Sequence, residues 1–143
     1  MNYFEIKKDD DIEKLMREFN YFHDSCIKEI KYCSGGYVDD KGAMYPFNSE
    51  RSVNVIFQSQ NANTRVIEMK FEKIKKLNLV PRDEEYDCII YDASIKKVND
   101  LFYWSESGDF KLEDVGEEDG TWISAENISW RPLENACGNK KIY

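Results

Sequence analysis

Proline and histidine are scarce in this sequence, and glycine is not abundant: the 143 residues include three prolines, one histidine and seven glycines. Disordered chains are rich in proline, glycine and charge and poor in aromatic residues, because they cannot bury enough apolar surface to fold. Here 41% of the residues are hydrophobic and 14% are aromatic. We therefore expect a folded chain, and its length fits a single domain over residues 1–143.

Long hydrophobic runs are also missing. The first residues, Met1 to Ile6, alternate polar and apolar side chains and then lead into charged ones. This pattern is unlike that of a signal peptide or a membrane-spanning segment. The expectation is a cytoplasmic protein without membrane association, in which the cysteines are reduced thiols that pack as small apolar side chains.

The four cysteines, Cys26, Cys33, Cys88 and Cys137, form no C-x-x-C pair, and only one histidine could join them as a ligand. A zinc site would need at least three of these scattered residues to converge, so we predict no metal. The motifs of phosphate loops, dinucleotide folds, zincin proteases and hydrolase elbows are absent as well. We predict no cofactor and favour a protein without catalytic activity.

Positive charge is deficient in one part of the chain only. Residues 83–120 contain 13 acids and 3 bases, a net charge of −10, whereas residues 1–82 and 121–143 each carry +1. An anionic surface repels nucleic acid and anionic membranes, so neither is expected as a partner. It would attract a basic protein, and the alternative is a solvated loop that only aids solubility. The acids expected to contact the partner are Asp114, Glu117, Glu118 and Asp119.

The clearest helical pattern follows the N-terminal residues. Apolar side chains recur at Ile12, Leu15, Met16 and Phe19, which places them on one face of a helix that we predict over residues 10–20. Asp10 and Glu13 have the spacing of a capping box, and Asn20 is a suitable stop. The apolar face of this helix is expected to cover a sheet.

Alternation with a period of two dominates the rest of the chain. Residues 53–57 and 67–71 read as the strands of a hairpin, with Glu68 on the wet face of the second strand. Because strands and helices do not alternate, we predict an α+β fold that is mainly antiparallel, with one N-terminal amphipathic helix packed on a meandering sheet. The pattern leaves open whether the sheet forms a sandwich or a partly closed barrel. Further strands are expected at 2–6, 26–33, 86–93, 101–105, 109–115, 121–125 and 127–131.

The tripeptide His23-Asp24-Ser25 invites a catalytic interpretation. In an extended strand, successive side chains point to opposite faces, so three adjacent residues should not converge as a triad. We instead expect Asp24 and Ser25 to hydrogen-bond the backbone and His23 to fill a polar niche. The alternation breaks between Ile27 and Ile30, which predicts a β-bulge just after this motif.

The alternative function is that of a small-ligand-binding protein or an enzyme with an aromatic pocket. Three tryptophans, Trp104, Trp122 and Trp130, are expected mainly in the core, but an exposed aromatic face could bind a ligand. Such a face could also join two copies of the chain, so monomer and homodimer both stay open. The residues of the alternative pocket are His23, Tyr32, Tyr91 and Trp104.

Several short motifs resemble those of small uncharacterised bacterial proteins that combine a helix with antiparallel strands. The motifs are Phe22-His23-Asp24-Ser25, Ile27 with Ile30, Tyr103-Trp104, and Ala125 with Trp130-Arg131. Some of these proteins look similar to immunity proteins of contact-dependent or polymorphic toxin systems. The resemblance implies a noncatalytic bacterial protein, with an immunity-type inhibitor as one such role, and it assigns no catalytic residues.

Overall fold

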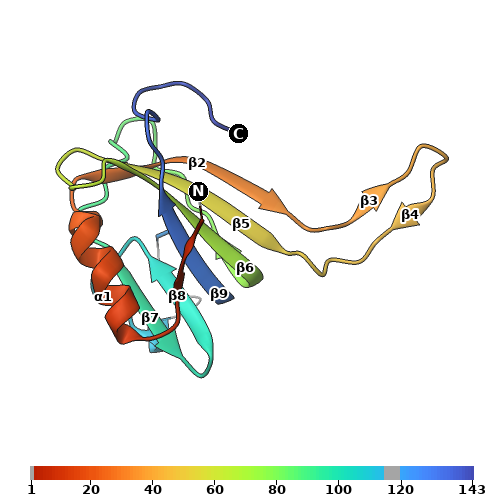
Figure 1. Cartoon of the computed structure of the whole chain (residues 1–143), viewed down its shortest axis with the longest axis horizontal. Helices are drawn as coiled ribbons and strands as arrows, with labels where there is room; N and C mark the ends of the chain where they lie inside the picture. The colour runs from red at the N-terminus through yellow and green to blue at the C-terminus, as the bar shows by residue number, and fades with distance from the viewer. Residues whose placement is uncertain (1, 115–119) are drawn as a thin grey trace.

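The computed structural model describes residues 2–114 and 120–143. Its main sheet is antiparallel, with the strand order β2-β5-β6-β9-β8-β7 and with β1 as a further neighbour of β9 (Figure 1). The order ends at β2 on one side and at β7 on the other, so the sheet is not closed into a barrel. The strands of this sheet are β1 (Phe4–Ile6), β2 (Ser25–Cys33), β5 (Ser52–Ser59), β6 (Val66–Asn78), β7 (Ser94–Val98), β8 (Leu101–Ser105) and β9 (Trp122–Pro132).

The predicted α+β architecture, with one helix on an antiparallel sheet, is confirmed. Helix α1 (Asp9–Glu18) buries Leu15 and Met16 against the sheet. Its start differs from the expected capping box, because the carboxylate of Asp11 accepts hydrogen bonds from the backbone nitrogens of Lys7 and Lys8, at 3.0 and 3.1 Å. The helix ends at Glu18, and a short 3-10 turn, η1 (Asn20–Phe22), leads into β2.

The hairpin of β5 and β6 agrees with the alternation in the sequence. Val53, Val55 and Phe57 are fully buried, and they pair with buried apolar residues of β6. On the next strand, the register between β2 and β5 shifts between Ile27 and Glu29, so the predicted bulge is present. These features were predictable because alternate strand residues share one face.

Four predicted strands differ from the structure. Residues 86–93 contribute only an isolated bridge between Ile90 and Ser25, and the described part of 109–115 contains the 3-10 turn η2 (Leu112–Asp114) instead of a strand. The separate strands expected at 121–125 and 127–131 form one long strand, β9. Because β6 pairs with β9 from Ile67 to Asn78, the sheet continues through Glu126 without a turn.

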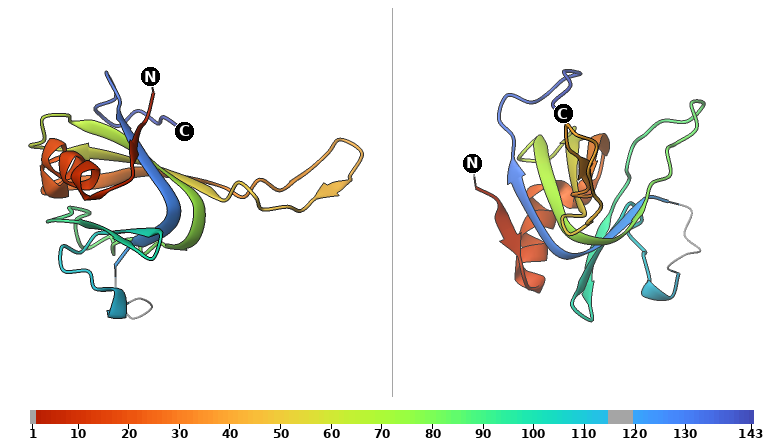
Figure 2. Two further views of the ribbon diagram at one scale, coloured as in Figure 1. Left: turned by 60° about the horizontal axis from the view of Figure 1, so that its bottom comes forward. Right: turned by 90° about the vertical axis from the view of Figure 1, so that its right-hand side faces the viewer.

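Strand β9 organises the centre of the sheet. One edge of β9 pairs with β6, and the other edge is shared by β8, which pairs with its first half, and β1, which pairs with its second half. Figure 2 shows β6 and β9 bending together. Between α1 and the sheet, aromatic rings of Phe22 and Phe57 pack edge to face, and both contact Trp104. All three tryptophans are buried, as expected.

Candidate functional site

A hairpin arm, residues 34–51, extends away from the sheet between β2 and β5 (Figure 1). Its strands are β3 (Tyr37–Val38) and β4 (Met44–Tyr45). The turn at the tip is encoded locally: the Asp39 carboxylate accepts hydrogen bonds from the backbone nitrogens of Lys41 and Ala43, both at 2.9 Å. Gly42 adopts a φ of +85°, which a residue without Cβ accommodates readily.

Large apolar side chains along this arm remain uncovered. Phe47 is 74% exposed and Met44 is 62% exposed, and Val38 also faces solvent. The rings of Tyr37 and Tyr45 stack on each other with centroids 4.7 Å apart and are otherwise open. Sequence reasoning missed this surface, although the apolar residues flanking a D-D-K-G turn were a usable signal. Contiguous exposed apolar side chains of this kind mark interaction surfaces.

A second exposed surface is the acidic loop, residues 79–93, which connects β6 to β7. Near its start, the Val80 nitrogen donates to the Thr121 hydroxyl at 3.0 Å, and near its end the Ile90 nitrogen donates to the Ser25 carbonyl at 2.7 Å. One end is therefore held at the residue before β9, and the other end is held at the start of β2. The carboxylates between these anchors are all exposed: Asp83, Glu84, Glu85 and Asp87.

The carboxylates of the acidic loop are available to a partner. Arg82, the base at its start, pairs with Glu106 at 3.5 Å. Asp83 and Asp87 each accept a hydrogen bond from a backbone nitrogen two residues on, at 3.0 Å. In the part of the chain that the structure describes, no lysine or arginine makes an ion pair with the four exposed carboxylates.

The acids predicted to contact a partner lie at the edge of what is described. Glu117, Glu118 and Asp119 fall outside the described residues, and Asp114 is the last residue of η2. Other carboxylates of the acidic segment, residues 83–120, are described, among them the four exposed ones of the acidic loop. The segment charge pointed to this part of the chain, but it could not select individual contact residues.

The motif His23-Asp24-Ser25 is arranged differently from the strand-based expectation. Asp24 has a φ of 56° and lies before β2, so its carboxylate turns back to within 3.5 Å of His23 Nε2. The prediction that Asp24 points away from His23 is therefore wrong. The Ser25 hydroxyl is buried and donates to the Phe22 carbonyl at 2.6 Å, which confirms its expected backbone role and leaves it unsuited to nucleophilic attack.

The residues of the alternative pocket are partly brought together. His23 Nδ1 contacts the Tyr91 carbonyl, so these two residues are neighbours, and both side chains face solvent. Trp104 is fully buried in the core. Tyr32 is exposed near the opposite end of β2, roughly 23 Å along an extended strand from Ser25.

A buried carboxylate lies on the sheet face opposite α1. Glu68 is only 3% exposed, so its expected place on a wet face is wrong. The Tyr3 hydroxyl donates to it at 2.6 Å, and Arg131 donates through Nε at 2.9 Å and pairs through Nη2 at 2.8 Å. Asn54 donates at 3.4 Å, and the Tyr143 hydroxyl completes the set. Both carboxylate oxygens of Glu68 are therefore occupied.

The electrostatics of this cluster keep Glu68 ionised. Burial alone would raise the pKa of the Glu68 carboxyl. Hydrogen bonds from Tyr143, Tyr3 and Arg131 outweigh burial, so the pKa of Glu68 is lowered overall. Burial, followed by the hydrogen bond to Glu68, raises the pKa of Tyr3 to about 12. The same two causes raise the pKa of Tyr143. An ionised and fully bonded carboxylate stabilises the fold and has no oxygen free to act as a general base.

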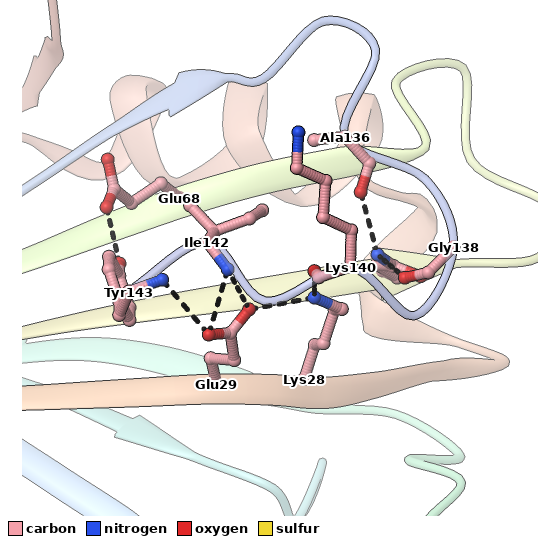
Figure 3. A network of polar contacts seen from close by, with 9 residues as sticks. Lys28, Glu29, Glu68, Ala136, Gly138, Lys140, Ile142 and Tyr143 are labelled. Atoms are coloured by element: carbon pink, nitrogen blue, oxygen red, sulfur yellow. Dashed lines mark hydrogen bonds and ion pairs between the residues drawn. The ribbon is translucent and has the colours of Figure 1, made fainter.

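The C-terminal tail, residues 134–143, covers this face of the sheet. Figure 3 shows its last residues bonded to Glu29 of β2 and to Glu68 of β6. Gln58 donates to the carbonyls of Ala136 and Gly138, at 3.0 and 3.1 Å. The Glu29 carboxylate accepts from the backbone nitrogens of Ile142 and Tyr143. A hydrogen bond from Lys28, followed by those from the tail, lowers the pKa of Glu29 to about 2.

A groove of about 400 Å³ lies between α1 and the strands β1 and β9. The rings of Phe4 and Trp130, with centroids 5.1 Å apart, form its apolar part. Two of its acids already serve the fold, since Asp11 caps α1 and Glu18 accepts a hydrogen bond from Thr64 at 2.7 Å. Its third acid, Glu5, makes an ion pair with Lys7 at 3.1 Å, so each of the three acids that line the groove has a partner within the fold.

No protein-family model matches the chain, and no curated protein or solved structure gives a significant match. Across residues 2–114 and 120–143, no three histidine, cysteine, aspartate or glutamate side chains gather as a metal site would require. Within the same residues, no helix is long and apolar enough to cross a membrane.

Proposed function

We propose that this chain is a noncatalytic protein-binding module that docks on a basic protein. The arm is the observation that carries this proposal, because it holds five large apolar side chains in solvent on a protruding hairpin. A hairpin of two short strands is marginal by itself in water, and burying its apolar surface would release about 25 cal/mol per Å². We expect the arm to insert into the partner, and the surface of the partner that receives it should be an apolar cleft.

Charge supports a basic partner. The acidic loop exposes four carboxylates that make no ion pair with a described lysine or arginine. The arm follows Cys33 at one end of β2, and the acidic loop is bonded to Ser25 at the other end. The two surfaces are therefore separate, and they would have different roles. The acidic segment would steer the encounter with a cationic protein, and the arm would anchor the complex.

An immunity-type inhibitor of the cytoplasm is the specific role that we favour within this class. It is supported by the motif resemblance and by four free cysteines, which suit a reducing compartment. An inhibitor needs no reacting groups of its own, and it can block its target by filling an apolar cleft. The arm has the protruding shape that this task requires.

The proposal is tested by capturing proteins from a lysate of the native host and then measuring each candidate as a purified pair. The arm variant combines Tyr37→Ser, Met44→Ser and Phe47→Ser, and the loop variant combines Asp83→Lys, Glu84→Lys and Glu85→Lys. A control variant combines Glu72→Lys, Glu126→Lys and Glu134→Lys, which are exposed residues elsewhere, so it changes the net charge equally. Stopped-flow mixing at several salt concentrations gives the association and dissociation rates.

We expect a basic protein whose dissociation rate rises at least 100-fold with the arm variant, a loss of about 2.8 kcal/mol in binding. The loop variant should slow association more than the control variant and should weaken the dependence on salt. Unchanged dissociation with the arm variant overturns the proposal. So does a dimer of this chain that becomes monomeric with the arm variant, because the arm's site would then lie on a second copy.

A further inference from the structure

Two cysteines that are 62 positions apart in the sequence meet where the acidic loop touches β2. An antiparallel bridge joins Ser25 to Ile90, with hydrogen bonds from the Asp24 nitrogen to the Ile90 carbonyl at 3.0 Å and from the Ile90 nitrogen to the Ser25 carbonyl at 2.7 Å. Cys26 follows Ser25 on β2, and Cys88 precedes Ile90 by two residues. The bridge therefore brings the chain segments of both thiols together.

The side chains confirm this proximity. Cys88 lines a hollow together with Ile27 and Ile90, beside the first residues of β2. Burial, followed by the charge of Cys88 and a hydrogen bond to it, raises the pKa of the Cys26 thiol, in keeping with the short separation that the backbone bridge imposes. Cys88 is exposed and Cys26 is half-buried, so their access to small reagents differs. An exposed thiol beside a second thiol is the arrangement of a cysteine pair that oxidises reversibly.

We infer that Cys26 and Cys88 form an oxidation site that takes up hydrogen peroxide and closes to a disulfide. The exposed Cys88 thiolate attacks peroxide; the O–O bond breaks, Cys88 becomes a sulfenic acid, and hydroxide leaves. The Cys26 sulfur then attacks the Cys88 sulfur; the S–S bond forms as the S–O bond breaks, and the departing hydroxide takes the Cys26 proton as water. The two thiols lose two electrons and two protons, and peroxide is reduced to two waters.

The other two cysteines provide internal controls. Cys33 lies at the far end of β2, seven residues from Cys26. Cys137 is exposed in the tail, between Ala136 and Gly138, whose carbonyls bind Gln58. Because Gln58 pairs with Cys26 across the strands, Cys137 is the competing partner that an experiment must exclude.

The disulfide would fasten the acidic loop to β2 covalently. Formation of this disulfide does not depend on the proposed function. Any change that the disulfide causes in partner binding would rest on that function. By closing a long loop of chain, the bond would also restrict the unfolded state, so the oxidised protein should resist urea better than the reduced protein.

The experiment treats the reduced full-length chain with a small excess of hydrogen peroxide and maps cross-linked peptides by mass spectrometry without reductant. We expect one Cys26–Cys88 peptide, loss of two thiols per chain, reversal by dithiothreitol and a raised urea midpoint. Cys137→Ser should keep all four results, and Cys88→Ser should abolish the cross-link. A Cys26–Cys137 peptide, or sulfinic acid at Cys88 without a cross-link, overturns the inference. The mapping needs no partner, so its failure is distinct from failure of the proposed function.

Discussion

Glu68 occupies a position that strand alternation assigns to solvent, yet it is buried. It lies on the sheet face opposite the main core, where Tyr3 comes from the start of the chain and Tyr143 from the tail. Arg131 reaches the same carboxylate from β9 and also lies over the Tyr3 ring, at 4.5 Å. One residue therefore connects four segments that are distant in sequence, and removing its charge should affect the whole fold.

We predict that Glu68→Gln lowers the free energy of unfolding by about 2 kcal/mol at pH 7, because a neutral amide replaces the carboxylate that accepts charge-assisted hydrogen bonds from Arg131 in this buried cluster. Urea unfolding with an unchanged m value measures this loss. Glu72→Gln, an exposed change on the same strand, should stay within about 0.5 kcal/mol. Equal effects of the two substitutions would show that the Glu68 cluster adds no stability.

The difference between wild type and Glu68→Gln should shrink in acid. The folded-state pKa of Glu68 is lowered from its ordinary 4.5, so its contribution is complete above pH 4.5 and is lost as the pH falls through the folded pKa. Repeating the urea measurement between pH 7 and pH 3 checks the sign. A gap that widens in acid would contradict the assigned direction.

For Tyr3 we expect the opposite pH dependence, with its contribution to stability lost as the pH rises. Burial and the hydrogen bond to Glu68 raise the pKa of Tyr3 from 10 to about 12 in the folded protein. Its contribution to stability is therefore complete below pH 10 and is lost as the pH rises through about 12. The absorbance of tyrosinate at about 295 nm, taken as wild type minus Tyr3→Phe, should show a step near pH 12 when folded. A step near pH 10 in the folded protein would mean that Tyr3 is not bonded to Glu68.

Among the elements, the hairpin of β7 and β8 has a two-residue turn whose chemistry can be tested. Asn99 and Asp100 both have positive φ, 51° and 65°, as the type I′ turn of a tight hairpin requires. Asp100→Gly should raise the free energy of unfolding by about 0.5 kcal/mol, since glycine adopts this conformation without strain. Asp100→Ala should lower it, because alanine has a Cβ and no turn-forming side chain. Thermal unfolding distinguishes the two, and a gain with alanine would contradict the turn assignment.

Prediction at the element scale succeeded where a pattern is local. The face of α1, the alternation in β5 and β6 and the bulge after Ile27 were all predictable, because neighbours along the chain set them. Residues 86–93 have strand-like composition, but only Ile90 pairs with a strand, through its bridge to Ser25 of β2, so the segment forms a loop. Composition cannot supply the missing neighbour, and a strand without one is unstable in water.

At the scale of the whole molecule, the tail and the arm should contribute differently to stability. Deleting residues 136–143 removes the Tyr143 bond to Glu68 and the tail bonds to Gln58 and Glu29. We expect a loss of about 2 kcal/mol in the free energy of unfolding.

Replacing residues 35–50 with Asn-Gly is the matched deletion. The Arg51 nitrogen already donates to the Ser34 carbonyl at 3.1 Å, so a two-residue turn closes the hairpin. No residue of the arm is buried, and we expect a change within about 1 kcal/mol by urea unfolding. A larger loss from this deletion than from the tail deletion would make the arm part of the stabilising core rather than a docking element.

The candidate site was predictable only in part. The segment charge located an acidic surface, because charge is a property of composition. The arm's exposure was not predicted, since apolar side chains of strands elsewhere in the same chain, such as those of β5, are fully buried. Whether an apolar hairpin is buried depends on which other elements pack against it. The arm extends away from both α1 and the main sheet (Figure 1).

The sequence by itself determined the amphipathic helix, the alternating strands, the antiparallel class and the segregation of charge, because each depends on residues close together in the chain. Only the tertiary structure decided the burial of Glu68, the shared edge of β9, the proximity of Asp24 to His23 and the meeting of Cys26 with Cys88. With the exception of Asp24, which a positive φ turns back, these features join segments that are tens of residues apart. Periodicity records which face a residue prefers, but it carries no information about which distant segment will cover that face.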